Sequence, residues 1–168
     1  WFQAYLLNMK PVEQTSHTVP LPPDAYVAMA VLAAVVGELF VPLPLLPETA
    51  IFGPLTSPGL AMGASGLWLE ISAARALTAA ATSTRPNWAA SALVTNGVFR
   101  RSRNPFYLGI LLLVAGAMLA FSLDWGLLLI PLLWLALDLL VVPVEERRLE
   151  AAFGQDFRDY AVRTRRWL

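Results

Sequence analysis

Cysteine is absent from the 168-residue sequence, and histidine occurs once, as His17. The absence of thiols excludes disulfide frameworks, thiolate nucleophiles and Cys/His zinc sites, so we expect no metal. Because the one histidine is near the start of the chain, a histidine proton shuttle is excluded from the rest of the sequence. Any chemistry must therefore depend on carboxylates, arginines and backbone groups.

Charge is scarce and balanced in sign. Charged residues make up 14% of the chain, with 12 basic and 12 acidic residues, so no basic field favours nucleic acid as a partner. Hydrophobic residues make up 57%, and the mean hydropathy is +0.59. This composition is well outside the usual range of a soluble domain with one core, and it predicts an integral membrane protein in contact with membrane lipids.

Four apolar stretches are long enough to cross a hydrocarbon core, which requires about 20 helical residues. The first is expected to stop or kink near Val41, because Pro42 and Pro44 follow it. Only residues 122–124 separate the last two, which predicts a tight antiparallel helical hairpin. The predicted spans are residues 25–46, 59–81, 105–122 and 125–144.

The predicted fold class is all-α. We expect a polytopic membrane helix bundle of about four transmembrane helices, with a C-terminal helical hairpin followed by an amphipathic interfacial helix. Gly154 interrupts that last segment, so one helix and two short helices meeting at a bend are both open. The chain is expected to divide into an N-terminal arm (1–24), two transmembrane helices (25–84) and a C-terminal core (85–168).

Arginines cluster between the second and third spans and again after the fourth. Positive residues in short loops stay on the cytoplasmic side of a membrane, so both clusters are expected to face the cytosol. With four spans, both termini then face the cytoplasm as well. The brevity of the chain predicts a bacterial inner membrane.

Asn104 and Pro105 form a helix-start signal at the third span, because Asn can cap a helix and Pro suits its first position. The unpaired N–H groups of a helix N-terminus favour a carboxylate or phosphate, and Arg103 comes immediately before them. Gly109 lies on the same face as the opening turn. It either lets a flat ligand approach the backbone or makes a small-residue contact between helices.

Glu145 and Glu146 lie at the other end of the hairpin, which folds back and brings them beside the start of the third span. They either hold a cation or pair with nearby arginines. Asp138 lies seven residues before Glu145, so these two carboxylates are expected to share one helix face and form a polar stripe into the bundle. Glu70 and Arg75 in the second span either neutralise one another or have a function.

Three motifs follow one another in the second half of the chain. The run Arg103-Asn-Pro-Phe-Tyr-Leu-Gly109 precedes the hairpin, Glu145-Glu146 follows it, and Phe153-Gly154 leads to Tyr160 and Arg163. In this order and at these separations, they resemble the isoprenylcysteine carboxyl methyltransferase and phospholipid methyltransferase superfamily. The resemblance covers about residues 85–168.

The resemblance implies a membrane-embedded methyltransferase that uses S-adenosylmethionine and acts on a lipophilic acceptor entering laterally from the bilayer. A carboxylate is the expected acceptor, ahead of a phospholipid amine. Arg103 and Glu146 are the implied catalytic residues, and Arg163 or Arg103 would orient an acceptor carboxylate. The implied cofactor contacts are Val94, Thr95, Gly97, Arg103, Asn104, Pro105, Tyr107, Leu108, Gly109, Glu145 and Glu146.

The sequence departs from the family pattern at two places. Asn104 replaces the family's histidine, and Gly97-Val98-Phe99 replaces Gly-Pro-Tyr. Asn can donate and accept hydrogen bonds but cannot titrate, so proton transfer at this position is excluded. For an amine acceptor, Glu145 or Glu146 would be the base.

Two other functions stay open. The Asn-Pro-x-Tyr-x-Gly stretch also resembles integral membrane sterol and steroid reductases, which bind NADPH. A non-catalytic membrane binding protein with the same fold is the other alternative.

Overall fold

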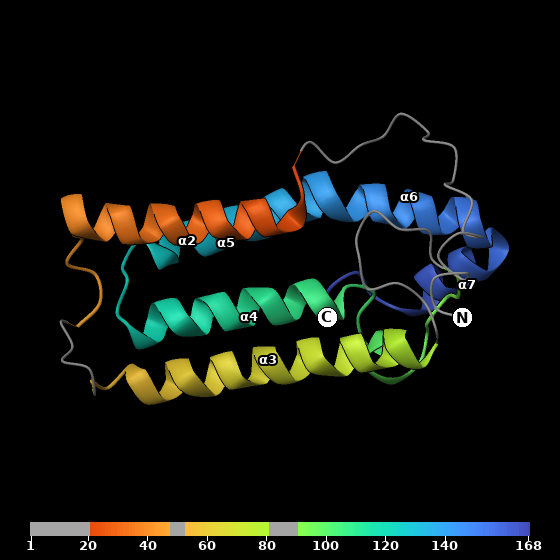
Figure 1. Ribbon diagram of the computed structural model, residues 1–168, viewed down its shortest axis with the longest axis horizontal. Coiled ribbons are helices and arrows are strands. Elements are labelled where there is room, and N and C mark those ends of the chain that lie inside the picture. The colour runs from red at the N-terminus through yellow and green to blue at the C-terminus, as the bar shows by residue number, and fades with distance from the viewer. Residues whose placement is uncertain (1–20, 48–52, 81–90) are drawn as a thin grey trace, which may run out of the picture.

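The computed structural model describes residues 21–47, 53–80 and 91–168 (Figure 1). All regular secondary structure in these ranges is helical, which confirms the predicted all-helical class. Most of the expected N-terminal arm, residues 1–20, lies outside the described residues.

Helices α2, α3, α4 and α5 run along the length of the bundle (Figure 1). Helix α2 packs beside α5, and α3 packs beside α4, the most extensive helix contact in the described structure. Helix α2 ends at Phe40, where the Pro-rich stretch was predicted to stop it. The bounds of the four helices are α2 Pro23–Phe40, α3 Thr56–Ala79, α4 Pro105–Ala120 and α5 Gly126–Ala136.

The predicted hairpin is formed by α4 and α5. Ser122 adopts a φ of 51°, in the left-handed region, where the chain reverses between the two helices. The backbone N–H groups of Leu45 and Leu46 donate to the buried Asp124 carboxylate, at 3.0 and 2.8 Å. Glu38 in turn accepts a hydrogen bond from the Asp124 N–H at 3.0 Å. The turn of the hairpin is thereby fixed to the end of α2.

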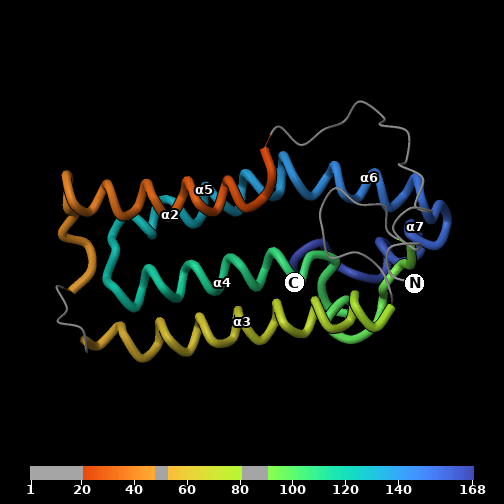
Figure 2. The backbone as a smooth tube through the Cα atoms, viewed as in Figure 1, coloured from red at the N-terminus to blue at the C-terminus, as the bar shows by residue number. Residues whose placement is uncertain are grey.

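The fourth predicted span is longer than expected. We predicted its end at residue 144, but α5 continues through the π-helical turn η2 (Leu137–Val141) into α6 (Val142–Phe153) (Figure 2). Pro143 has no N–H to donate to the carbonyl of Leu139, four residues earlier in the sequence. A wider turn accommodates this loss, and the N–H of Val142 reaches back to the Leu137 carbonyl oxygen.

Gly154 then separates α6 from α7 (Gln155–Arg163), so the alternative with two helices meeting at a bend is the one found. Its φ of 54° is a backbone conformation that favours glycine. A short 3₁₀ helix, η1 (Gly97–Arg100), precedes α4.

Glycines allow α3 and α4 to pack backbone against backbone. A Cβ atom added to Gly66 would lie 2.5 Å from the Gly109 carbonyl oxygen, and one added to Gly109 would lie 2.7 Å from Glu70 Cγ. Such close approach is typical of helix pairs in membranes, where van der Waals packing replaces the hydrophobic effect. For Gly109, the small-residue helix contact is therefore the alternative that the structure contains.

The protein has two candidate membrane spans among its described residues. Pro23–Phe40 and the continuous helix Gly126–Phe153 are long and apolar enough to cross a bilayer, and Pro105–Ala120 is a shorter apolar helix. Large apolar side chains are exposed on the outside of the bundle, among them Leu39, Leu60 and Trp68. Exposed apolar surface on this scale is what lipid would cover in a membrane protein.

Candidate functional site

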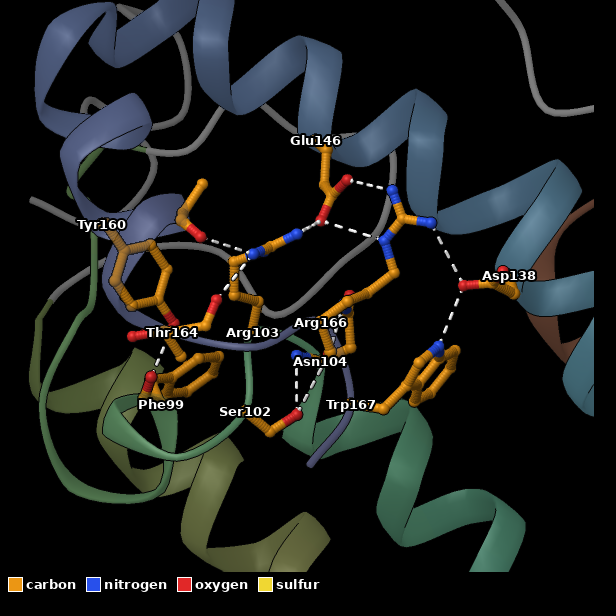
Figure 3. Close-up of polar contacts among 11 residues, drawn as sticks. Phe99, Ser102, Arg103, Asn104, Asp138, Glu146, Tyr160, Thr164, Arg166 and Trp167 are labelled. Carbon is orange, nitrogen blue, oxygen red and sulfur yellow. Dashed lines mark hydrogen bonds and ion pairs between the residues drawn. The ribbon is translucent and has the colours of Figure 1, made fainter.

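Charged and polar side chains gather at the end of the bundle where α4 begins. They come from the residues before α4, from η2 and α6, and from the C-terminal segment, residues 164–168, which returns to this end of the molecule (Figure 3). The site thus joins both ends of the hairpin, as the sequence predicted.

Arg103 and Glu146 form the centre of this cluster. The Nε and Nη2 atoms of Arg103 donate to Glu146 Oε1 at 3.0 and 2.8 Å. Its Nη1 donates to the carbonyl oxygens of Ala161 and Thr164 at 2.8 and 2.6 Å. Both charged side chains are largely buried, with 15% and 17% of their surface exposed. Arg103 therefore connects α6 to the end of α7, and each nitrogen of its guanidinium has a partner.

Glu145 lies beside Glu146 in sequence but has a different partner. The hydroxyl of Tyr107, in the first turn of α4, donates to Glu145 Oε1 at 2.6 Å. Tyr107 is buried and packs with Leu111, Leu133, Leu137 and other residues of the core between α4 and α5. This contact ties the start of α4 directly to α6.

Asn104 does not play the capping role that we predicted. It occupies the N-cap position of α4, but its side chain makes no cap hydrogen bond. Its Nδ2 atom instead donates to the carbonyl oxygen of Arg166 at 3.0 Å, which draws the side chain away from the helix end. The backbone N–H groups of the first turn of α4 therefore have no side-chain cap.

Sequence reasoning missed Arg166. Its Nη2 donates to Glu146 Oε2 at 2.7 Å, and its Nη1 donates to Asp138 Oδ1 at 3.2 Å. The indole Nε1 of Trp167 also donates to Asp138 Oδ1, at 2.9 Å (Figure 3). The available signal was weak: an Arg-Arg-Trp run near the last residue, and a buried-span aspartate that needed a cationic partner.

The electrostatics of the C-terminal segment follow from these contacts. The hydrogen bond to Glu146 raises the pKa of Arg166, burial partly opposes this rise, and Asp138 adds to it. Burial raises the pKa of Tyr160 to about 12, against the opposing charge of Arg103. Tyr160 therefore stays protonated at neutral pH, and its hydroxyl donates to the Phe99 carbonyl oxygen at 2.6 Å.

The side chains of the other predicted site residues make none of these polar contacts. Arg163, proposed to bind substrate, is exposed, and its Nε donates to the Asp159 carbonyl oxygen of the same helix at 3.1 Å. Val94 and Thr95 line a cavity of about 240 Å³ at the end of α3. Gly97 lines a second cavity, of about 430 Å³. Pro105 is buried in the first turn of α4, and Leu108 is half-buried in the same helix.

Glu70 and Arg75 do not neutralise one another. Glu70 Oε1 is buried without a hydrogen-bond partner, at the contact between α3 and α4. No ion pair joins these two residues within the described part of the chain.

Fold and site together define a helical membrane protein with a polar cluster at one end of its bundle. A family model described as phospholipid methyltransferase matches residues 55–156. The chain belongs to this family, and it is a membrane methyltransferase that uses S-adenosylmethionine and acts on a lipid-type acceptor. The family assignment supports methyl transfer over the NADPH-dependent and non-catalytic alternatives. Comparisons with curated proteins and with solved structures give no match.

The residues of the site fit this cofactor. The uncapped first turn of α4 offers N–H groups and a positive dipole end to the methionine carboxylate. Carboxylates suit the ammonium group and the ribose hydroxyls, and Glu145 and Glu146 lie beside that turn.

Proposed function

We propose that this protein methylates the amine of a phospholipid at the site where Tyr107, Glu145, Arg103 and Glu146 meet. The resemblance to isoprenylcysteine carboxyl methyltransferases favoured a carboxylate acceptor, oriented by Arg103 or Arg163. One observation supports the amine instead: every nitrogen of the Arg103 guanidinium is already hydrogen-bonded within the protein. Arg163 is exposed on α7, and within the described part of the chain its side chain makes no hydrogen bond or ion pair with the cluster.

Glu145 is the residue best suited to an amine acceptor. A carboxylate offers about four lone-pair sites, and the Tyr107 hydroxyl uses one of those on Glu145. Glu146, by contrast, has donors on both of its oxygens. We therefore assign to Glu145 the recognition of the ammonium group of the phospholipid acceptor and the removal of a proton from it.

Methyl transfer requires the protein mainly to bind and position the two reactants. S-adenosylmethionine, when bound, supplies an electrophilic methyl group, so displacement mainly needs proximity, alignment and exclusion of water. Glu145 would take a proton from the ammonium group of the acceptor, which frees the nitrogen lone pair to accept the methyl group that the bound cofactor would supply, with S-adenosylhomocysteine as the second product. Asn104 cannot titrate and serves only in binding.

The proposed cofactor contacts are the first turn of α4 and the two glutamates. Pro105 and Leu108 belong to that turn, and Val94, Thr95 and Gly97 lie on the segment that leads to it. Gly109 contributes through close packing of α4 on α3. These assignments keep the C-terminal core, residues 85–168, as the unit that binds the cofactor.

For the membrane, we propose four spanning helices: α2, α3, α4 and the continuous helix from α5 to α6. The last has 28 residues and is about 42 Å long, which exceeds a hydrocarbon core of about 30 Å. Its surplus lies at the α6 end, where Arg147 and Arg148 follow the glutamates. Arginine-rich segments stay cytoplasmic, so the site and both termini face the cytoplasm, in a bacterial inner membrane.

The test is methylation by the purified protein in lipid nanodiscs with labelled S-adenosylmethionine. We expect label in nanodisc phosphatidylethanolamine, and no label in a farnesylated cysteine offered as the carboxylate acceptor. Glu145→Gln should abolish the transfer. Label in the farnesylated cysteine alone would restore the carboxylate hypothesis and overturn the proposed acceptor.

A further inference from the structure

We infer that Arg166 is a positioning residue of the methyl-transfer site, holding Glu146 and the C-terminal segment against the start of α4. The inference rests on the proposed function of that site. Arg166 lies beyond residue 156, so the family match does not include it. Its guanidinium bridges Asp138 and Glu146, with 35% of the side chain exposed (Figure 3).

The π turn η2 brings Asp138 and Glu146 to one side of the helix, where Arg166 binds both. Asp138 and Glu146 are eight residues apart, a spacing that turns the second side chain by about 80° in a regular α-helix of 3.6 residues per turn. The π turn contains one extra residue, so eight residues span what seven span elsewhere, and the two carboxylates return to one face. One guanidinium then reaches both.

Two arginines fix the position of Glu146. Arg103 binds its Oε1, and Arg166 binds its Oε2 at 2.7 Å with a longer contact to Oε1 at 3.4 Å. Asp138 completes a cluster of two cations and two anions, so none of these partly buried charges lacks a counterpart. Without Arg166, Glu146 keeps one partner and Asp138 keeps only the Trp167 indole.

Hydrogen bonds to the backbone around Arg166 connect this cluster of charges to the residues before α4. Its carbonyl oxygen accepts from Asn104 Nδ2 at 3.0 Å and from Ser102 Oγ at 3.2 Å. The N–H of Arg103 donates to the carbonyl oxygen of the neighbouring Arg165 at 2.9 Å. The side chain of Arg166 thus anchors the segment on η2 and α6 while its backbone holds the residues that precede the first turn of α4.

The experiment measures S-adenosylhomocysteine binding by calorimetry and the KM for S-adenosylmethionine in the full-length protein. Arg166→Gln should raise both the Kd and this KM about tenfold, with a smaller change in kcat, because misplacement of a binding group weakens affinity steeply. Arg166→Lys should recover part of the affinity. Arg165→Gln removes the same charge from an exposed neighbouring side chain, keeps the backbone carbonyl oxygen that accepts from the Arg103 N–H, and should bind like the wild type.

If Arg166→Gln does not fold, Asp138→Asn tests the same bridge with a smaller change. In combination with Arg166→Lys, its effect should be less than additive, because both changes act on one contact. Affinity in Asp138→Asn or Arg166→Gln equal to that of Arg165→Gln would overturn the inference. Failure of the wild type to bind S-adenosylhomocysteine at all would instead overturn the proposed function.

Discussion

The hydroxyl groups of Tyr107 and Tyr160 each donate one hydrogen bond, but the two acceptors differ in kind. Tyr107 donates to the Glu145 carboxylate, and Tyr160 donates to a backbone carbonyl before α4. Both rings are buried, so removal of either hydroxyl leaves the packing in place. The pair allows the role of the Glu145 contact to be separated from a general loss of stability.

Tyr107→Phe should weaken S-adenosylhomocysteine binding about tenfold, since a hydrogen bond to a charged group contributes about 1.5–3 kcal/mol and tenfold corresponds to 1.4 kcal/mol. Tyr160→Phe is the matched control and should lower the thermal unfolding temperature without changing the Kd. Calorimetry and thermal unfolding in detergent measure the two effects. Equal Kd values in both variants would contradict a role for the Tyr107–Glu145 contact in cofactor binding.

At the scale of elements, the contact between α3 and α4 depends on which glycines of α3 lie directly against the backbone of α4. A Cβ at Gly66 would lie 2.5 Å from the Gly109 carbonyl oxygen, whereas the nearest atoms to a Cβ at Gly63 are 3.8 Å away. Both residues are buried in the same helix, yet only the first has no space for a methyl group.

Gly66→Ala should therefore destabilise the protein by about 1–3 kcal/mol, the usual cost of overpacking. Gly63→Ala should be neutral or should stabilise the helix by up to about 1 kcal/mol, because Ala has the higher helix propensity. Unfolding of both variants in the same detergent provides the comparison. A larger loss in Gly63→Ala than in Gly66→Ala would show that the two helices pack in a different register.

Local signals in the sequence predicted the hairpin and the end of α2. Three residues between two apolar stretches permit only a tight reversal, and prolines after Val41 stop the first helix. The prediction that Asp138 and Glu145 share one helix face was wrong because it assumed a regular α-helix. The π turn shifts the register by one residue, so Glu146 shares the face of Asp138, and Glu145 turns to Tyr107.

The position of the C-terminal segment could not be predicted in the same way. Its partners lie on α6, on η2 and before α4, and no short-range pattern relates residue 166 to residues 104 and 138. The capping role of Asn104 was predicted wrongly for the same reason, because a distant carbonyl oxygen attracts its side chain. Tertiary contacts decide such choices after the helices have formed.

At the scale of the whole molecule, the bundle separates an apolar body from one polar end. Helix α6, the start of α4 and the C-terminal segment meet at that end (Figure 1). The neighbouring helices expose large apolar side chains on their outer surfaces. A water-soluble cofactor and a lipid acceptor have opposite solubilities, so they must meet at a membrane surface. The arrangement suits a reaction between these two reactants.

The most direct test of this account is calorimetric titration of the detergent-solubilised protein with S-adenosylhomocysteine, beside NADPH, for the wild type and Glu145→Gln. The account predicts saturable binding of S-adenosylhomocysteine to the wild type, no binding of NADPH, and at least tenfold weaker binding to the variant, as expected for loss of a charge-assisted contact. Binding of NADPH alone, or equal affinity of the two proteins for S-adenosylhomocysteine, would contradict it.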